Sequence, residues 1–425
     1  MKKKKASLGR RMKEFVKTSV VWGPLDHNLF FTIIFLNVYG IIMVYSASYN
    51  NSITKNYSYF MNNQLKNVIF GFIIMIIASY INYHRIVRFG WGWFWLFLAV
   101  CIIAALKTPL AHSELGATRW IKLGSISFQA AEPIKAAIII FFAYYVSYWG
   151  LNRWYNQVLA CLIAIALLGF LFFFSNNLST VIVLFCICAV IILSSVKKPD
   201  LYWYFLIGLA LVIIAAIFVT VYLLMHQGAE NFRFVRIRAW LHPEEYAADE
   251  GLQAMQARYA IGAGGFWGKG LGQSLIKFKL SYSYNDFILA IICEELGVFG
   301  VIVMMTLFGY LLYRIYKIAQ NAWDIEGKVL AIGVFTQIAL QLLINVMVVT
   351  SVIPTTGVTL PFFSAGGTSV VFLLAELGMV LNVDKYAKER RFFEEAERHV
   401  AQMEQRGGIG AAGWRRRLDS ARTHR

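Results

Sequence analysis

Long apolar segments separated by short polar connections run along most of the chain. A helix needs about 20 apolar residues to cross roughly 30 Å of hydrocarbon, and many of these segments approach that length. They lie at 29–48, 67–82, 90–106, 131–148, 157–174, 178–195, 202–225, 286–313, 329–351 and 366–383. The pattern predicts an all-α polytopic membrane protein with about ten transmembrane helices.

Composition agrees with this class of protein. Of the 425 residues, 59% are hydrophobic and 15% are charged, and a soluble protein of this length could not bury so much apolar surface. The five cysteines all fall inside predicted spans, and the seven histidines form no HExxH pattern. The sequence therefore supports neither a disulfide framework nor a thiolate or histidine metal site.

The distribution of Lys and Arg predicts the orientation in the membrane. With ten spans both termini share one side, and that side receives 27 of the 40 basic residues. Cytoplasmic segments are enriched in these residues, so both termini are expected in the cytoplasm. The basic arm 1–28 lacks a small-residue cleavage site before the first span, which predicts a retained anchor. We expect a ten-helix domain at 29–383 and a cytoplasmic tail at 384–425.

The net charge of +17 does not indicate nucleic-acid binding. Most of the excess lies in the two tails that flank membrane helices, where anionic lipid is the simpler partner. In the C-terminal tail, the stretch KERRFFEEAERHVAQMEQR has charges at helical spacing. We therefore expect cytoplasmic extensions without chemistry of their own.

One connection is much longer than the others. Residues 226–285 lie on the predicted external side, between helices 7 and 8, and are basic where positive charge should be depleted. This indicates an external anionic ligand. The motif GAGGFWGKGLG within it lacks the spacing of a nucleotide-binding loop. Two interpretations stay open: tight glycine turns against the bilayer surface, or backbone N–H groups that bind an external phosphate together with Lys269.

Two charged residues fall inside the fourth predicted span. Glu132 and Lys135 are three residues apart, so they are neighbours on one helix face. Ionisable residues within spans are costly and are usually functional or paired. The pair either neutralises itself and shapes the bundle, or lines a polar cavity and orients a catalytic group. Spacing alone does not separate these two interpretations.

The stretch SYSYNDFILAIICEELG places Asp286 at the predicted start of a span. The positive end of a helix dipole stabilises a carboxylate there, and helix capping is its ordinary role. In a continuous helix Glu294 would lie about 80° away from Asp286 and Glu295 on the opposite face. Both glutamates are expected about 12–14 Å further along, well below the outer surface, in structural or networked roles.

The stretch IPTTGVTLPFFSAGGTSVV carries no charge but contains prolines, glycines and hydroxyls at membrane depth. Irregular backbone survives there only if it is buried in protein or lines a cavity. We therefore predict a re-entrant turn beside the site. Its expected lining residues are Pro354, Thr356, Gly357, Pro361, Ser364, Gly366 and Gly367.

Several separated motifs, in this order, resemble the SEDS family (shape, elongation, division and sporulation) of membrane-embedded peptidoglycan polymerases. They are GATRWIKLGSISFQAAEPIK at 116–135, AIGAGGFWGKGLGQS at 260–274, NDFILAIICEELG at 285–297, Asn345, and PTTGVTLPFFSAGGTSVV at 354–371. The VTLP of the last motif is closer to division members than to elongation members. The chain departs from the family in QAAE at 129–132, in NNLST at 176–180, where an acid is missing, and in Ala365, where a tyrosine is usual.

The resemblance implies a glycosyltransferase that polymerises lipid II, the undecaprenyl-pyrophosphate disaccharide-pentapeptide. It would act at the outer face of the bacterial cytoplasmic membrane, at the division septum, with a class B penicillin-binding transpeptidase and other division proteins. The family's essential aspartate maps onto Asp286, and the acid and base of its fourth helix map onto Glu132 and Lys135. The expected substrate-binding residues are Arg119, Arg233, Arg236, Arg238, Gln253, Lys269 and Lys277.

The chemistry expected from this reading is general-base catalysis. Asp286 would deprotonate the acceptor hydroxyl, and the external cations would stabilise the departing pyrophosphate. No metal site is assigned, although Mg²⁺ or Mn²⁺ near Asp286 could share that task. The alternatives are a lipid II flippase, an elongation-type polymerase and a non-catalytic division scaffold.

Overall fold

The computed structural model describes most of the chain, and every structural statement below concerns these residues. They are 21, 23–48, 59–109, 111–114, 117–123, 126–175, 177–196, 232–245, 250–278, 280, 284–365, 367–405 and 414–415. The predicted span 202–225 lies outside them.

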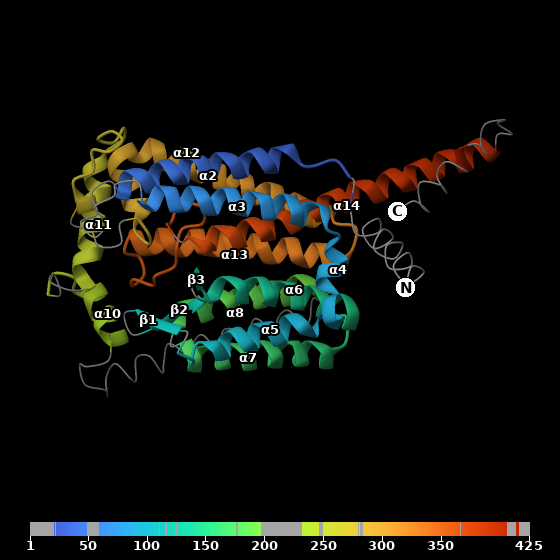
Figure 1. The fold of residues 1–425 in the computed structure, drawn as a ribbon, viewed down its shortest axis with the longest axis horizontal. Helices are drawn as coiled ribbons and strands as arrows, with labels where there is room; N and C mark the ends of the chain where they lie inside the picture. Colours follow the sequence, from blue (N-terminus) through green and yellow to red (C-terminus); the bar gives the residue numbers. More distant parts are fainter. Residues whose placement is uncertain are drawn as a thin grey trace, which may run out of the picture.

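Most of the described residues form one helical bundle (Figure 1). In chain order its long helices are α2 (His27–Ser48), α3 (Tyr59–Tyr80), α5 (Trp93–Ala105), α6 (Ala131–Trp149), α7 (Trp154–Ser175), α8 (Leu178–Ser195), α12 (Ile288–Asn321), α13 (Ile325–Val349) and α14 (Thr368–Gln405). The shorter helical elements are α4 (Tyr83–Val87), η1 (Phe89–Gly92), α10 (Phe232–Leu241), α11 (Glu250–Gly264) and η2 (Ile276–Phe278).

The two ends of the bundle differ (Figure 1). One end carries α10, α11 and a small sheet, and we call it the loop end. The other end carries α4, and the C-terminal half of α14 projects beyond it; we call it the tail end. The predicted external connection 226–285 thus contains helices of its own, and α14 continues without interruption past the expected boundary between residues 383 and 384.

The helices agree with the predicted spans as far as the structure describes them. Nine of the ten predicted segments coincide with long helices of the described chain. Six of these helices are long and apolar enough to cross a membrane: α2, α3, α7, α8, α12 and α13. Large side chains on their outward faces, such as Phe70, Phe173 and Ile302, are more than half exposed, as lipid contact requires. The multi-pass membrane class is confirmed, whereas the number ten stays a prediction.

The described chain is mostly helical, as predicted for the all-α class, and it also contains one small sheet. Residues 111–129 form a three-stranded antiparallel sheet of β1 (Ala111–Glu114), β2 (Ala117–Leu123) and β3 (Ile126–Gln129), in which Trp120 pairs with Gln129 and Ile121 with Phe128. The short connections between the strands favour hairpins over a helix. The sheet leads directly into α6, so it fixes where that helix begins.

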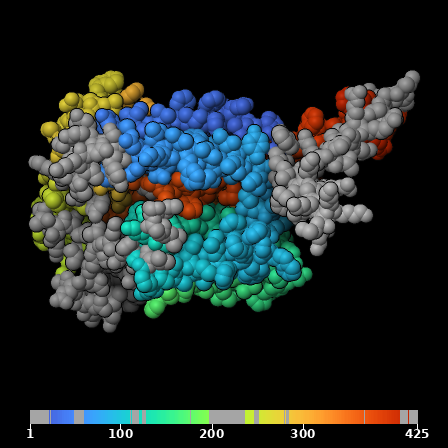
Figure 2. Space-filling model, in the orientation of Figure 1, coloured from blue at the N-terminus to red at the C-terminus, as the bar shows by residue number. Residues whose placement is uncertain are grey.

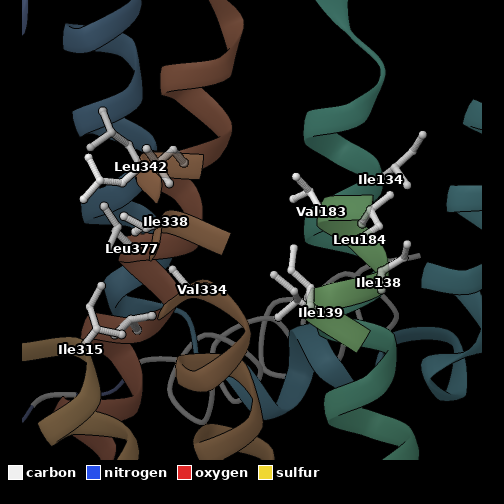
Figure 3. Packing of buried hydrophobic residues seen from close by; sticks show 14 of the residues in the cluster. Ile134, Ile138, Ile139, Val183, Leu184, Ile315, Val334, Ile338, Leu342 and Leu377 are labelled. Carbon is white, nitrogen blue, oxygen red and sulfur yellow. The ribbon is translucent and has the colours of Figure 1, made fainter. Parts of the chain in front are cut away.

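Apolar packing joins the helices below the loop end. Figure 3 shows two groups of buried side chains, one on α6 and α8 and one on α12, α13 and α14. The helices α6 and α13 approach closely at Gly333, where an added Cβ would lie 2.6 Å from Ile139. This contact holds the two groups in one core.

A polar cluster joins the helices α4, α6 and α13 at the tail end. Tyr83 and His84 of α4 contact Asp324, at 2.6 and 2.7 Å. Arg88 contacts Glu326 at 2.8 Å. Glu326 also accepts a hydrogen bond from Ser147 of α6. Asp324 caps α13 through the N–H of Gly327.

We expect this cluster to lose stability on acidification. Burial alone would raise the pKa of Asp324, but hydrogen bonds from His84, Gly327 and Tyr83 hold that pKa below its usual range. A carboxyl with a lowered pKa stabilises the fold above its unfolded pKa, and this contribution is lost as the pH falls through the folded pKa. As the pH falls through the acidic range, the midpoint of thermal unfolding should therefore drop further for the wild type than for Asp324→Asn. The asparagine keeps the cap but carries no carboxyl group. Equal pH profiles would contradict this.

Candidate functional site

A polar stripe on α13 faces the interior near the loop end. Gln337, Gln341 and Asn345 lie four residues apart, so they share one face of the helix. All three are buried among apolar helices, where unpaired amides are costly. Sequence reasoning missed Gln337 and Gln341, although three amides at this spacing in an apolar span are a readable signal.

The intramembrane pair of α6 packs opposite this stripe. Glu132 and Lys135 are 4% and 3% exposed, and Lys135 Nζ lies 2.9 Å from Glu132 Oε1. The prediction that they are neighbours on one face is confirmed. On the other side of the stripe, Gln337 Nε2 donates a hydrogen bond of 2.8 Å to Glu376 of α14.

Two adjoining cavities lie between these groups, and we call them together the polar chamber. They hold about 350 and 300 Å³ of space, part of it open to solvent. Both are lined by Glu132, Gln341 and Thr359, and Lys135 lines the larger one. The other polar lining residues are Gln129, Asn177, Ser179, Thr180, Ser364 and Ser369. A chamber that combines a charge pair with amides and hydroxyls suits a polar, hydroxyl-rich ligand.

The irregular segment 354–365 forms one wall of the chamber. Gly357 has a φ of +72° and lines the larger cavity with its neighbours, while the buried Pro361 and Ser364 line the smaller one. The Ser364 hydroxyl accepts from the Leu360 N–H and donates to the Asn285 carbonyl, at 2.7 and 2.9 Å. The predicted irregular backbone beside a polar site is therefore present.

The remaining predicted residues of this segment are placed less centrally. Pro354 and Thr356 are half-buried and are not among the chamber-lining residues that the structure describes. Gly367 has a φ of +53° and immediately precedes α14. Gly366 lies outside the described residues.

Asp286 lies in a turn directly before the cap of α12. Its carbonyl accepts a hydrogen bond of 2.9 Å from Asn345 Nδ2, and the same amide donates to the Val358 carbonyl at 2.9 Å. Val358 lines the larger cavity. One amide thus joins the backbone of Asp286 to the chamber wall, although the two are far apart in sequence.

The helix that follows Asp286 is broken at Gly297. This glycine has a φ of +65° and a ψ of −164°, a conformation open essentially only to glycine. The break leaves carbonyls and N–H groups without helical partners, and the loop after α11 pairs with them. The bonds are Lys269 N to Glu294 O, Gly270 N to Glu295 O, Val298 N to Gly265 O and Phe299 N to Phe266 O, at 2.9 to 3.1 Å.

The break changes the course of the segment that carries the two glutamates. Glu295 accepts from Ser46, which lies two residues before the loop-end terminus of α2. The segment Ile288–Leu296 therefore runs between the loop-end termini of α2 and α13 and does not descend through the bundle. The expectation of a networked role for these glutamates holds, and the structure places Glu295 near the loop end of the bundle, beside the last turn of α2.

The same network occupies two predicted substrate-binding cations. Lys277 is buried and donates to Glu295 and to the carbonyls of Ser46 and Gly272. Lys269 Nζ lies 2.8 Å from Glu294, which also accepts from Ser274. The prediction that Lys277 faces a substrate is therefore wrong, because its charge is neutralised inside the protein.

The other predicted cations are spread over the loop end. Arg236 lines a separate small cavity between α10 and the end of α13, and Arg238 and Gln253 are half-buried on α10 and α11. The side chains of Arg119 and Arg233 lie outside the described part of the chain. Those predicted cations whose side chains the structure describes therefore do not line the polar chamber.

Gly297 offers a direct test of the broken helix. A Cβ there would lie 2.4 Å from the Gly268 N and the Phe266 O, so Gly297→Ala should destabilise the protein by about 2–4 kcal/mol. The matched control is Gly309→Ala on the same helix, where a Cβ meets nothing within 4 Å and the gain is about 0.5–1 kcal/mol. Thermal unfolding in detergent distinguishes them, and equal shifts would contradict the break.

Fold and chamber together define a polytopic helical membrane protein with an irregular segment beside a buried polar site near one end. A family model described as "Cell cycle protein", covering FtsW, RodA and SpoVE, matches residues 26–389. The chain belongs to this family.

Individual relatives agree with this assignment. The chain is 31% identical over 384 residues to a protein of Trichlorobacter lovleyi named "Probable peptidoglycan glycosyltransferase FtsW", with 88% of this chain and 96% of the relative covered. It is 33% identical over 370 residues to stage V sporulation protein E of Bacillus subtilis, with 84% and 96% covered.

Two solved structures share the fold. A chain from "Structural coordination of polymerization and crosslinking by a peptidoglycan synthase complex" has a TM-score of 0.71 at 21% identity, with 86% of this chain and 99% of that chain covered. The rod shape determining protein RodA of Thermus thermophilus has a TM-score of 0.61 at 21% identity, with 86% and 98% covered. The chain therefore has the architecture of this family.

Proposed function

We propose that this chain is a peptidoglycan glycosyltransferase that polymerises lipid II at the outer face of the cytoplasmic membrane during septal wall synthesis. The observation that carries the proposal is the polar chamber, in which the buried Glu132–Lys135 pair lies beside a wall bonded to the backbone of Asp286. Family membership and relatives named as glycosyltransferases support the reaction class.

In the proposed reaction, Asp286 removes the proton from the GlcNAc 4-hydroxyl of one lipid II. The hydroxyl oxygen attacks the MurNAc anomeric carbon of the other chain with inversion, and undecaprenyl pyrophosphate leaves. General-base assistance of this kind is worth about 10²–10⁴-fold in rate. Asn345 fixes the turn that presents Asp286, and the amides and hydroxyls of the chamber orient the sugars.

A divalent ion at this site would need ligands from the substrate as well as from the protein. Among the described residues, no group of three or more His, Cys, Asp or Glu side chains is close enough to hold a metal. Mg²⁺ and Mn²⁺ are often held by one carboxylate together with substrate phosphates, so Asp286 would supply the protein ligand. Such an ion would neutralise charge on the leaving pyrophosphate.

The polyprenyl tails of both substrates need lipid beside the site. Figure 2 shows α14 recessed between α3 and the side of the molecule that carries α5. Such a band gives an apolar chain lateral access to the region where α14 meets the chamber. We propose that the loop end is external and both termini are cytoplasmic, and that a class B penicillin-binding protein and other division proteins are partners.

The extent of the buried polar groups along α13 bears on one alternative, a lipid II flippase. A lipid II flippase needs a polar path to the tail end, but beyond Gln337 the helix α13 presents the buried apolar Val334 and Leu330. This favours chemistry at the loop end. A non-catalytic scaffold would leave Asp286 dispensable, and an elongation-type polymerase would pair with a different transpeptidase.

The test is polymerisation by the purified protein. It is incubated with labelled lipid II, with and without its cognate transpeptidase, in the presence of moenomycin, which blocks the unrelated soluble-fold glycosyltransferases. We expect moenomycin-resistant glycan strands. Absence of polymer in every combination would reject the proposed function.

A further inference from the structure

The polar chamber needs a partner for the anionic group of its substrate, and none of the predicted cations whose side chains the structure describes lines it. This inference rests on the proposed function and concerns where the diphosphate binds. Within the described part of the chain, Lys135 is the one cation that lines the chamber, and Glu132 neutralises it. The next source of positive potential among the described residues is the end of a helix.

The N-terminus of α14 opens at the chamber. Ser369 and Val370, in its first turn, line the smaller cavity together with Glu132 and Ser364. The first turn of a helix leaves backbone N–H groups without intrahelical partners and carries the positive end of the dipole. In α14 these are the N–H groups of Thr368, Ser369 and Val370.

Side chains around this turn also lack partners. The hydroxyls of Thr368 and Ser369 are buried without a hydrogen bond. Gln64 of α3 is 1% exposed, and neither its amide nitrogen nor its amide oxygen has a partner. Buried polar atoms are rarely left unbonded, so three such side chains at one place indicate a ligand.

The packing of α3 on α14 places Gln64 at this helix start. Asn67 Nδ2 lies 3.5 Å from the position of a Cβ on Gly367, and Gly71 packs against Val371. The two helices run in the same direction, because Gly378 packs against Met75 and Ala78 further along. Gln64 precedes Asn67 by about one turn of α3, and so lies on the side toward which the N–H groups of the first turn of α14 point.

We propose that the N-terminal turn of α14, with the Thr368 and Ser369 hydroxyls and the Gln64 amide, binds the diphosphate of a polyprenyl-linked sugar. Helix N-termini bind phosphate groups through free N–H groups and the dipole. The hydroxyls and the amide nitrogen donate further hydrogen bonds to phosphate oxygens. The recessed band between α3 and α5 leads the polyprenyl chain from this turn into lipid (Figure 2).

Binding of farnesyl diphosphate to the full-length protein in zwitterionic nanodiscs tests the site. Farnesol supplies the tail without the anion, and inorganic pyrophosphate supplies the anion without the tail. Ser369→Asp places a carboxylate where the anion would bind and also suits a helix start. It should weaken farnesyl diphosphate binding at least about tenfold and leave farnesol binding and thermal stability unchanged.

Gln64→Leu is a second test, because a purely structural role of Gln64 would not lower diphosphate affinity while thermal stability is kept. Leucine replaces an unpartnered buried amide by an apolar side chain of similar size, so thermal stability should stay equal or rise while diphosphate affinity falls severalfold. The matched control is Gln320→Leu on an exposed tail-end position of α12, which should change neither. If Ser369→Asp proves unstable, Gln64→Leu decides alone.

Unchanged diphosphate affinity in both variants would overturn the proposal. Displacement of farnesyl diphosphate by added phosphatidylglycerol at equal potency would also overturn it, because the turn would then be a general headgroup site. If the wild type makes no polymer but binds diphosphate as described, the proposed function fails and this site stands.

Discussion

Asp286→Asn should lower lipid II polymerisation by about 10²–10⁴-fold, the range expected for loss of a general base. Asparagine keeps the size of the side chain and its preference for a helix start, and the Asn345 bond to this turn uses the backbone carbonyl. The fold should therefore persist while the basic oxygen is lost. Gel analysis of glycan strands made by the purified variant measures the effect.

The control for this variant is Glu245→Gln, which removes an exposed carboxylate at the loop end and should leave polymerisation unchanged. Equal thermal unfolding of the three proteins would show that the loss is chemical. Full polymerisation by Asp286→Asn would reject the assignment of Asp286 as the general base. If variants without Asp286 and variants without the Glu132–Lys135 pair both polymerise lipid II, the reaction centre lies elsewhere.

Breaking the Glu132–Lys135 pair should have the second large effect. Lys135→Met leaves Glu132 as an unpaired buried carboxylate, and Glu132→Gln leaves Lys135 as an unpaired buried cation. Each single variant should lose about 3–5 kcal/mol of stability, because an uncompensated buried charge is strongly destabilising. The double variant Glu132→Gln with Lys135→Met removes both charges and should recover most of that stability.

This double-mutant cycle separates the two interpretations of the pair that spacing left open. If the pair only shapes the bundle, the stable double variant polymerises lipid II like the wild type. If the pair serves the reaction, the double variant is stable and inactive. Thermal unfolding and glycan gels on the same four proteins give both readouts, and we expect the second outcome.

The segment around Asp286 shows which features the local sequence pattern predicts and which it does not. Its charges, its apolar run and the glycine at its end are visible in the printed chain. A continuous helix was the natural expectation, since periodicity does not report a break at a single glycine. The break became evident through the loop after α11, whose backbone bonds to both sides of Gly297.

The fate of the basic residues shows the same limit. The basic residues of the long connection predicted an external anionic ligand. Nothing in the sequence assigned different roles to the individual cations. Lys277 and Lys269 are instead paired with Glu295 and Glu294, because their segment folds back onto the broken helix. The small sheet before α6 was missed as well: it lies between the predicted spans 90–106 and 131–148, in a connection to which no secondary structure was assigned.

The sequence by itself determined the membrane class, the positions of nine described helices, the Glu132–Lys135 contact and the family, because all of these depend on hydrophobicity and spacing within short segments. Only the tertiary structure decided which of the described charges are paired, how the backbone of Asp286 is joined to the chamber wall, and that Gln341 of α13 lines the chamber. Those properties depend on side chains brought together from distant segments, and helix packing sets them.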